Sequence, residues 1–135
     1  IQQYVRKTGQ DVRVLVIGNE AVAAVRRRAR VGRLSQTLIR GARLERTILS
    51  EPQRRAAVDA ARLVGLEVAA VDLLDVRGAP KVFEVNSSPG LTEMEAVTGI
   101  DLGSKVIERA EQLVRAARRP KSGADLPSSL RMATE

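Results

Sequence analysis

Three polar side chains stand in segments that are otherwise apolar, and together they have the chemistry to bind a divalent cation. Asp72 interrupts the apolar run 68–74, and Glu84 and Asn86 alternate with apolar residues in 81–86. Both segments have the composition of strands. Because Glu84 and Asn86 are two positions apart, their side chains project from the same face of a strand.

A turn between these segments would bring the three side chains together. The sequence Arg77-Gly78-Ala79-Pro80 predicts a hairpin turn, which places Asp72 across from Glu84 and Asn86. Two carboxylates and an amide suit Mg²⁺ or Mn²⁺ and not zinc. The alternative is that all three are exposed residues of a half-solvated sheet. Carboxylates that face each other repel, which favours a cation or an arginine between them.

Two arginines are candidates for binding phosphate groups. Arg13 lies inside the expected strand 12–17, and Arg40 is followed by Gly41, where the backbone can approach a ligand closely. Spacing alone does not distinguish either of them from a surface arginine. The chain contains neither the Gly-Lys-Ser/Thr of a P-loop nor a Gly-x-Gly-x-x-Gly motif.

The positive charge is concentrated in one segment. The 135 residues include 23 Lys and Arg against 16 Asp and Glu, a net charge of +7, and residues 26–46 hold eight arginines and one glutamate. Such a segment favours anionic partners. A nucleic-acid-binding module is therefore the second hypothesis, although this segment lacks the aromatic side chains that stack on bases.

The composition excludes several kinds of site. With no His and no Cys, the chain has neither a zinc site of Cys and His ligands nor a thiol nucleophile nor a Ser-His-Asp triad. No apolar stretch reaches the roughly 18–20 residues that a membrane span needs. Since the chain begins at Ile1 and not at Met, we expect it to be a piece of a longer protein.

The hydrophobic pattern predicts an α+β fold, an antiparallel sheet with helices packed on one side. Residues 30–47 are expected to form a basic loop with a short strand near 37–39. Residues 1–117 are expected to form the domain, and residues 118–135 a disordered tail. The expected elements are strands 12–17 and 20–28, a helix capped by Ser50 and ended by Gly65, strands 68–76 and 81–86, a helix 92–97 capped by Thr92, and a last helix capped by Asp101.

The chain carries a series of motifs in a fixed order. They are Asp11-Val12-Arg13, Gly18-Asn19-Glu20-Ala21-Val22-Ala23-Ala24, Arg40-Gly41, Val71-Asp72-Leu73-Leu74, Phe83-Glu84-Val85-Asn86-Ser87-Ser88-Pro89-Gly90 and Thr98-Gly99-Ile100-Asp101. The series resembles the C-terminal half of an ATP-grasp domain, and within that superfamily the RimK-like α-L-glutamate ligases. The resemblance runs from about residue 2 to residue 114.

The resemblance implies a role for each matching residue. Asp72, Glu84 and Asn86 match the ligands of two Mg²⁺ (or Mn²⁺) ions, with Glu84 bridging them. The residues implied in binding ATP are Gln3 and Tyr4 at the adenine hinge, Asp11 as a nucleotide-contacting acid, and Thr37, which replaces an Asn of the family's motif. Those implied at the reacting phosphate are Arg40 and Arg13.

The implied chemistry is carboxylate activation. ATP phosphorylates a carboxylate to an acylphosphate with release of ADP, and an amine then attacks to form an amide. The expected substrates are an amino acid such as glutamate and an acidic peptide or small-molecule acceptor. Ser35 and Ala42 depart from the family's pattern, which leaves the acceptor open.

The family also has parts that would precede Ile1. The chain is therefore expected to be inactive alone and to come from a longer cytoplasmic enzyme, of a family that commonly forms homo-oligomers. A degenerate, non-catalytic ATP-grasp domain is the third hypothesis.

Overall fold

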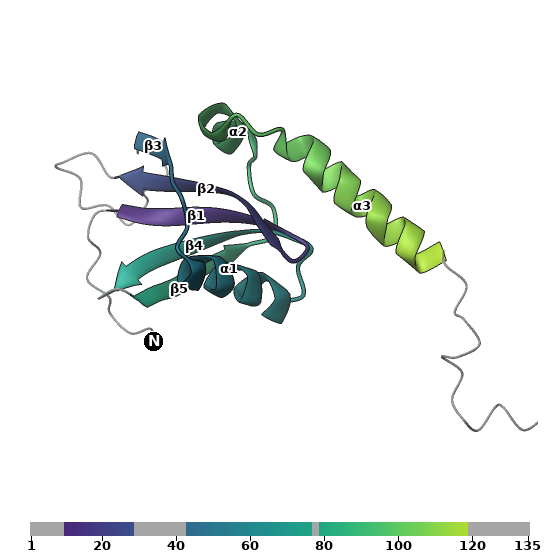
Figure 1. The fold of residues 1–135 in the computed structure, drawn as a ribbon, viewed down its shortest axis with the longest axis horizontal. Coiled ribbons are helices and arrows are strands. Elements are labelled where there is room, and N and C mark those ends of the chain that lie inside the picture. The colour runs from purple at the N-terminus through teal and green to yellow at the C-terminus, as the bar shows by residue number, and fades with distance from the viewer. Residues whose placement is uncertain (1–9, 29–42, 77–78, 119–135) are drawn as a thin grey trace, which may run out of the picture.

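A computed structural model describes residues 10–28, 43–76 and 79–118 of the chain. In this part the chain forms five strands and three helices (Figure 1). The strands are β1 (Gln10–Ile17), β2 (Glu20–Arg28), β3 (Arg43–Arg46), β4 (Val68–Val76) and β5 (Ala79–Asn86). The helices are α1 (Glu51–Leu63), α2 (Thr92–Thr98) and α3 (Leu102–Arg118).

All five strands belong to one antiparallel sheet with the order β3-β2-β1-β4-β5. β1 is therefore the central strand, and its residues alternate regularly between the two faces of the sheet. The β1–β2 hairpin turns at Gly18 and Asn19, where Gly18 adopts a φ of 59°, a conformation that glycine reaches without strain. The antiparallel sheet predicted from the sequence is confirmed.

One face of the sheet is covered by α1. Ser50 caps this helix as the sequence predicts, because its hydroxyl accepts from the backbone N–H of Gln53 while the Gln53 side chain accepts from the Ser50 N–H. The fully buried Ala57 and Ala61 of α1 pack against this face. Their partners in the sheet are Val12, Val14, Val16, Ala24, Ala69, Val71 and Leu73.

The opposite face carries a second core cluster. Leu15 and Ile17 of β1 pack there with Met94 of α2 and Leu102 of α3. Because Leu15 and Ile17 alternate with the valines beneath α1, the two clusters lie on opposite faces of the sheet. The α+β class is therefore confirmed, but the expected packing of all helices on one side is wrong. A helical stripe shows that a helix has a buried face, and it does not show which face of the sheet it covers.

The two C-terminal helices are linked by their caps. The expected cap at Thr92 is wrong, since α2 begins after Leu91 without a side-chain cap. Asp101 does cap α3, because its Oδ1 accepts from the Ser104 N–H at 2.9 Å. Glu95 of α2 also accepts from the first N–H groups of α3, those of Leu102 (2.8 Å) and Gly103 (3.0 Å).

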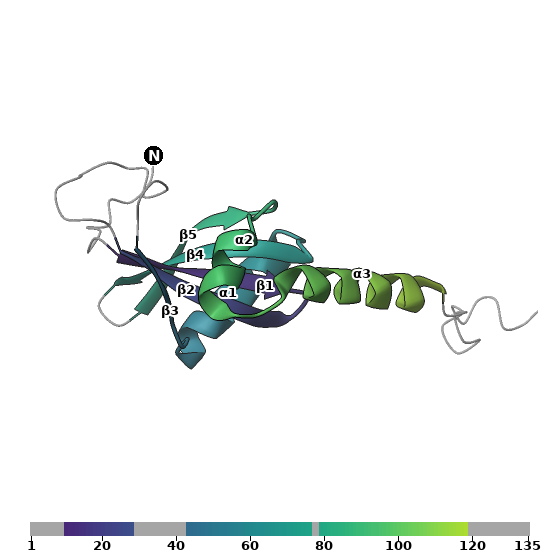
Figure 2. The same ribbon diagram turned by 90° about the horizontal axis from the view of Figure 1, so that it is seen from above.

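The helix α3 extends beyond the edge of the sheet (Figures 1 and 2). Its first residue, Leu102, is buried, whereas every residue from Ala110 to Arg118 is exposed. Ile107 and Val114, expected on the packed face, are 63% and 49% exposed. No helix in the described part of the chain has the length and hydropathy that crossing a membrane requires.

Two expectations concern the basic segment 30–47. β3 was not predicted: it is an edge strand that pairs Arg43–Arg46 with residues 25–28 of β2. Its sequence, Arg-Leu-Glu-Arg, lacks the alternation that marks a half-buried strand. The short strand expected near 37–39 lies outside the described residues, and so do residues 119–135 of the expected tail.

Candidate metal and nucleotide site

The three candidate cation ligands lie together on β4 and β5. Asp72 pairs directly with Glu84, and Ala70 pairs with Asn86 two positions further along the sheet. A β-bulge follows, since Leu73 pairs with Val82 and leaves Phe83 as the extra residue. The cross-strand pairing of Asp72 with Glu84 therefore agrees with the prediction from the sequence.

Burial differs sharply among these three side chains. Asp72 is among the largest fully buried residues, with only 1% of its surface exposed, whereas Glu84 is exposed and Asn86 is half-buried. The Asn86 Oδ1 accepts from the backbone N–H of Ser88 at 2.8 Å, which fixes the direction of the amide. The site thus has one fixed acid in the sheet and one acid at its surface.

Asp72 is held by two arginines. Its Oδ1 accepts from Arg13 Nε at 2.7 Å, and its Oδ2 accepts from Arg13 Nη2 at 2.8 Å and from Arg27 Nη2 at 2.6 Å. Arg13 is its neighbour in register on β1, while Arg27 reaches it from β2, beyond β1. The two guanidinium groups satisfy a carboxylate that would otherwise be buried at high cost.

Arg27 in turn is fixed by Asp11, its cross-strand partner in the β1–β2 hairpin. Its Nε and Nη2 donate to Oδ1 and Oδ2 of Asp11 at 2.6 and 3.0 Å. Burial alone would lower the pKa of Arg27, but the hydrogen bond to Asp11 and the charges of Asp72 and Asp11 outweigh it, so its pKa is raised. Arg27 therefore stays charged, and the four residues form a neutral chain Asp11–Arg27–Asp72–Arg13.

Arg27 was not among the residues predicted for the site. A regular hairpin that turns at Gly18 and Asn19 would place Arg26 opposite Asp11, and only the irregularity in pairing between Leu15 and Val16 brings Arg27 there. The family resemblance implied that Asp11 contacts the nucleotide directly. The geometry does not support that contact: the Asp11 side chain is 0% exposed and both its oxygens accept from Arg27.

The donor set of this site suits a hard cation. Two carboxylates and an amide oxygen on adjacent strands are the ligands that Mg²⁺ and Mn²⁺ take in proteins, with water or phosphate completing the shell. Within residues 10–28, 43–76 and 79–118 no three His, Cys, Asp or Glu side chains cluster as a metal site. Asp72, Glu84 and Asn86 would therefore need ligands from a substrate or solvent.

Of the remaining predicted site residues, the structure places only Arg13. Gln3, Tyr4, Thr37 and Arg40 all lie outside the described residues. Arg13 does lie at the site, on the same face of the sheet as Asp72.

The other described arginines of the basic segment mostly have partners. Arg28 and Arg43 both pair with Glu45, at 3.4 and 3.3 Å, and Arg26 donates to the Thr47 hydroxyl. Arg27 is buried and Glu45 offsets one charge, but the Arg28 and Arg43 side chains remain 53% and 80% exposed. The described part of the segment therefore stays basic at its surface, without the aromatic side chains that stack on bases.

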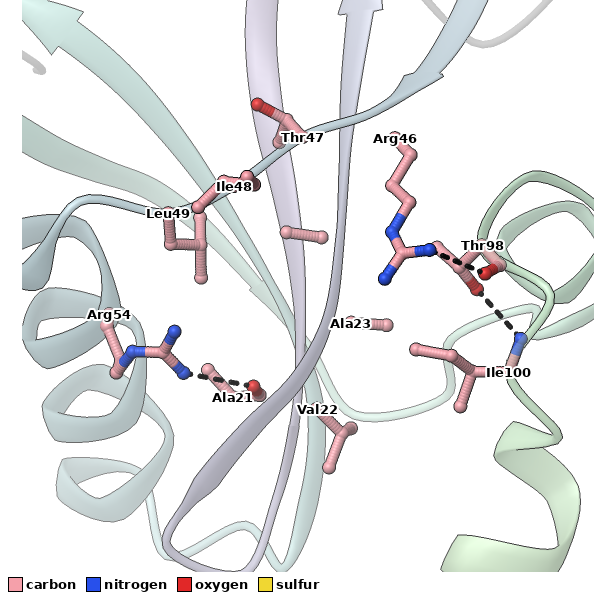
Figure 3. Close-up of a pocket in the computed structure, with 11 residues that line it drawn as sticks. Ala21, Val22, Ala23, Arg46, Thr47, Ile48, Leu49, Arg54, Thr98 and Ile100 are labelled. Atoms are coloured by element: carbon pink, nitrogen blue, oxygen red, sulfur yellow. Dashed lines mark hydrogen bonds between the residues drawn. The ribbon is translucent and has the colours of Figure 1, made fainter.

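A pocket of about 190 Å³ lies elsewhere, at the edge of β2 (Figure 3). Its walls include Arg46, which donates to the Thr98 carbonyl, and Arg54, which donates to the Ala21 carbonyl. None of the predicted site residues lines it. It is smaller than the roughly 300–1,000 Å³ of typical ligand pockets, so it is not the expected nucleotide site.

Comparisons with known proteins agree with the motifs. The chain is 43% identical over 124 residues to a probable alpha-L-glutamate ligase of Serratia proteamaculans, an alignment that covers 91% of this chain and 41% of that protein. It is 42% identical over 113 residues to the ribosomal protein bS6--L-glutamate ligase of Escherichia fergusonii, an alignment that covers 83% of this chain and 38% of that protein. The chain thus spans about two fifths of the length of these relatives.

Solved structures show the same fold. The ATP-grasp ligase PsnB, in complex with a phosphomimetic variant of its minimal precursor, Mg and ADP, matches with a TM-score of 0.61 and 27% identity, covering 76% of this chain and 32% of that one. D-alanine--D-alanine ligase of Bacillus anthracis matches with a TM-score of 0.66 and 18% identity, covering 86% and 44%. Residues 1–110 match the RimK-like ATP-grasp domain, and the chain belongs to that family.

Proposed function

We propose that this chain supplies the Mg²⁺–ATP half of the active site of an ATP-dependent carboxylate–amine ligase, of the kind that adds glutamate through an acylphosphate. The observation that carries the proposal is the pairing of Asp72 with Glu84, with Asn86 on the same face and Arg13 beside them. The names of the curated relatives, both glutamate ligases, support it.

In this proposal Asp72, Glu84 and Asn86 would hold two Mg²⁺ or Mn²⁺ ions. The ions would neutralise charge on the phosphates of ATP as the γ-phosphoryl group moves to the carboxylate. The buried Asp72 gives the site a fixed position, because Arg27, itself held by Asp11, donates to its Oδ2. The exposed Glu84 supplies a ligand that is able to adjust.

The other residues of the proposal have roles in binding and orientation. Arg13, and Arg40 outside the described residues, would bind the phosphate oxygens near the reacting carboxylate, where guanidinium groups stabilise the developing charge. Gln3, Tyr4 and Thr37 would bind the nucleotide. No step requires a covalent nucleophile on the protein, which agrees with a chain that has neither Cys nor His.

The substrates belong to the same proposal. A glutamate donor and a peptide acceptor are supported by the relative named as a ligase of ribosomal protein bS6 and by a structure of PsnB with its precursor peptide. We take the acceptor to be acidic, as the family resemblance implies. ATP is the phosphoryl donor. A cytoplasmic location and a homo-oligomeric assembly of the complete enzyme are further parts of the proposal.

The test uses the natural polypeptide that contains these 135 residues. The protein is incubated with Mg²⁺ and ATP, with a panel of amino acids and acidic peptides, and both ADP and AMP are quantified. We expect ADP to form only with the correct amino acid and peptide, and Glu84→Gln to lower its rate by about a hundredfold or more, as loss of a charge-stabilising group does.

Glu93→Gln is the matched control, since Glu93 is an exposed acid of α2 outside the predicted site. It should form ADP at the wild-type rate. AMP as the product, or equal rates in Glu84→Gln and wild type, would reject the proposed function.

A further inference from the structure

Two guanidinium groups donate hydrogen bonds to the carboxylate of Asp72, which is proposed to bind a cation. Of the three hydrogen bonds to Asp72, two come from Arg13 and one from Arg27. A carboxylate offers about four acceptor positions. Among the described residues, one position on Oδ1 therefore has no hydrogen-bond donor, and the other three accept from arginines.

The two arginines are held very differently. The side chain of Arg27 is 9% exposed and makes two further hydrogen bonds to Asp11, whose side chain is 0% exposed. The side chain of Arg13 is 22% exposed, and in the described part of the chain its only ion-pair partner is Asp72. Arg13 is therefore the arginine that can move away from Asp72. Its movement would leave no other buried carboxylate without a partner, whereas movement of Arg27 would leave Asp11 unpaired.

A cation bound at Asp72 would be repelled by Arg13 in its present place. Mg²⁺–oxygen bonds are about 2.1 Å long, and Arg13 Nε lies 2.7 Å from Oδ1. A cation on that oxygen would thus lie within roughly 5 Å of a positive guanidinium group, a separation at which like charges disfavour each other strongly. Arg27 is screened from the same effect, because Asp11 neutralises it.

We propose that Arg13 is a built-in counter-ion that a divalent cation displaces from Asp72, while Arg27, fixed by Asp11, is the positioning residue that keeps this carboxylate in place during the exchange. The inference rests on the cation site of the proposed function. It adds an order of binding events at the site. Arg13 neutralises Asp72 before the cation binds, and afterwards the positive charge of Arg13 is available to an anionic ligand.

The first test measures binding of Mn²⁺ alone to the 135-residue chain, through the paramagnetic resonance signal of the free ion. Arg13→Gln removes the competing charge, so its affinity for Mn²⁺ should exceed that of wild type by about tenfold or more. Arg13→Lys keeps the charge and should bind Mn²⁺ within about threefold of wild type. The gain should vanish in the double variant with Asp72→Asn.

Arg28→Gln is the matched control for distant charge. It removes the same charge from β2, at a side chain that is 53% exposed and paired with Glu45. Its Mn²⁺ affinity should stay within about twofold of wild type, because exposed charges are screened by solvent. An equal gain in Mn²⁺ affinity in Arg28→Gln and Arg13→Gln would show that the effect comes from the net charge of the chain, and this would overturn the proposal.

A second test observes the exchange in the wild-type chain and does not depend on a variant that folds. Magnetic resonance of the arginine Nε–H groups during a titration with Mg²⁺ should show the Arg13 signal move and exchange faster with water. The Arg27 signal should remain in place and protected. An Arg13 signal unchanged when the site is saturated, or an Arg27 signal that moves equally, would contradict the proposal.

These outcomes are separate from those of the proposed function. If Arg13→Gln binds Mn²⁺ no better than wild type, including the case where neither binds it, the exchange is wrong even when the complete enzyme forms ADP. If Arg13→Gln binds Mn²⁺ more tightly and the complete enzyme forms no ADP, the exchange stands and the ligase function fails.

Discussion

The buried chain Asp11–Arg27–Asp72–Arg13 makes a quantitative prediction about stability. Replacing Arg27 by Met removes its three hydrogen bonds and leaves Asp11, a 0% exposed carboxylate, without its partner. Breaking a buried ion pair from one side costs about 3–5 kcal/mol, because the remaining charge stays buried. Asp72 loses less, since it keeps two hydrogen bonds from Arg13.

The measurement is the free energy of unfolding in urea at neutral pH. With a denaturant slope of about 1.5 kcal/mol per molar, typical of a chain of this size, the midpoint of Arg27→Met should fall by about 2–3 M. Arg28→Met is the matched control, one residue along the same strand. Its exposed pair with Glu45, 3.4 Å apart, contributes about 0–1 kcal/mol.

A double-mutant cycle separates the ion pair from other effects of the Met side chain. Asp11→Asn leaves Arg27 with Asp72 as its partner, so we expect a smaller cost of about 1–3 kcal/mol. In the Asp11→Asn, Arg27→Met double variant no buried charge remains at position 11, and the combined loss should be about 1–3 kcal/mol less than the sum of the singles. Additive losses, or a loss below about 1 kcal/mol for Arg27→Met, would refute the reasoning.

Two further predictions concern the turn and the last helix. Gly18 and Gly65 both have a positive φ, so Gly18→Ala and Gly65→Ala should each lower the unfolding free energy by about 1–2 kcal/mol. An added Cβ at Gly18 would lie 2.8 Å from Nε at the end of the Arg109 side chain, which can move aside; an unchanged urea midpoint in either variant would contradict this. The hydrogen bonds from Ser104 lower the pKa of Asp101, so the charged cap stabilises α3 above the ordinary pKa of 3.8 and this contribution is lost as pH falls through the lowered pKa. The melting temperature of Asp101→Asn should therefore be lower than that of wild type at pH 7, and the difference should disappear below pH 3.8. A difference that does not change with pH would show that the charge has no role.

The hairpin at the site could be predicted because it depends on a local turn signal, which brings Asp72 near Glu84. The exact pairing needs the bulge, because counting from the Val76–Ala79 pair without it would place Asp72 opposite Phe83. The capping box of Ser50 and Gln53 and the cap at Asp101 are equally local, and both are present. The bulge at Phe83 is not visible in the alternation, because one extra residue changes which side chains share a face.

What could not be predicted depends on contacts across the sheet. Arg27 stands in a run of three arginines, and nothing in that run distinguishes the buried one from Arg26 and Arg28. Its burial follows only from the register with Asp11 and from the position of Asp72 on the far side of β1. Pairing across a central strand is not contained in the pattern of any single strand, and this is why the sequence did not single out Arg27.

The exposed second half of α3 affects how unfolding of the whole chain will proceed. From Ala110 to Arg118 every residue is exposed, so the helical state there depends on intrinsic propensity and on pairs such as Arg115 with Glu111. A short helix held by these terms alone is marginal in water. The segment should therefore lose helicity gradually on warming, before the sheet unfolds cooperatively. A single melting temperature would then describe the sheet and not the chain, and far-ultraviolet ellipticity should begin to fall before protection of the β1 amides is lost.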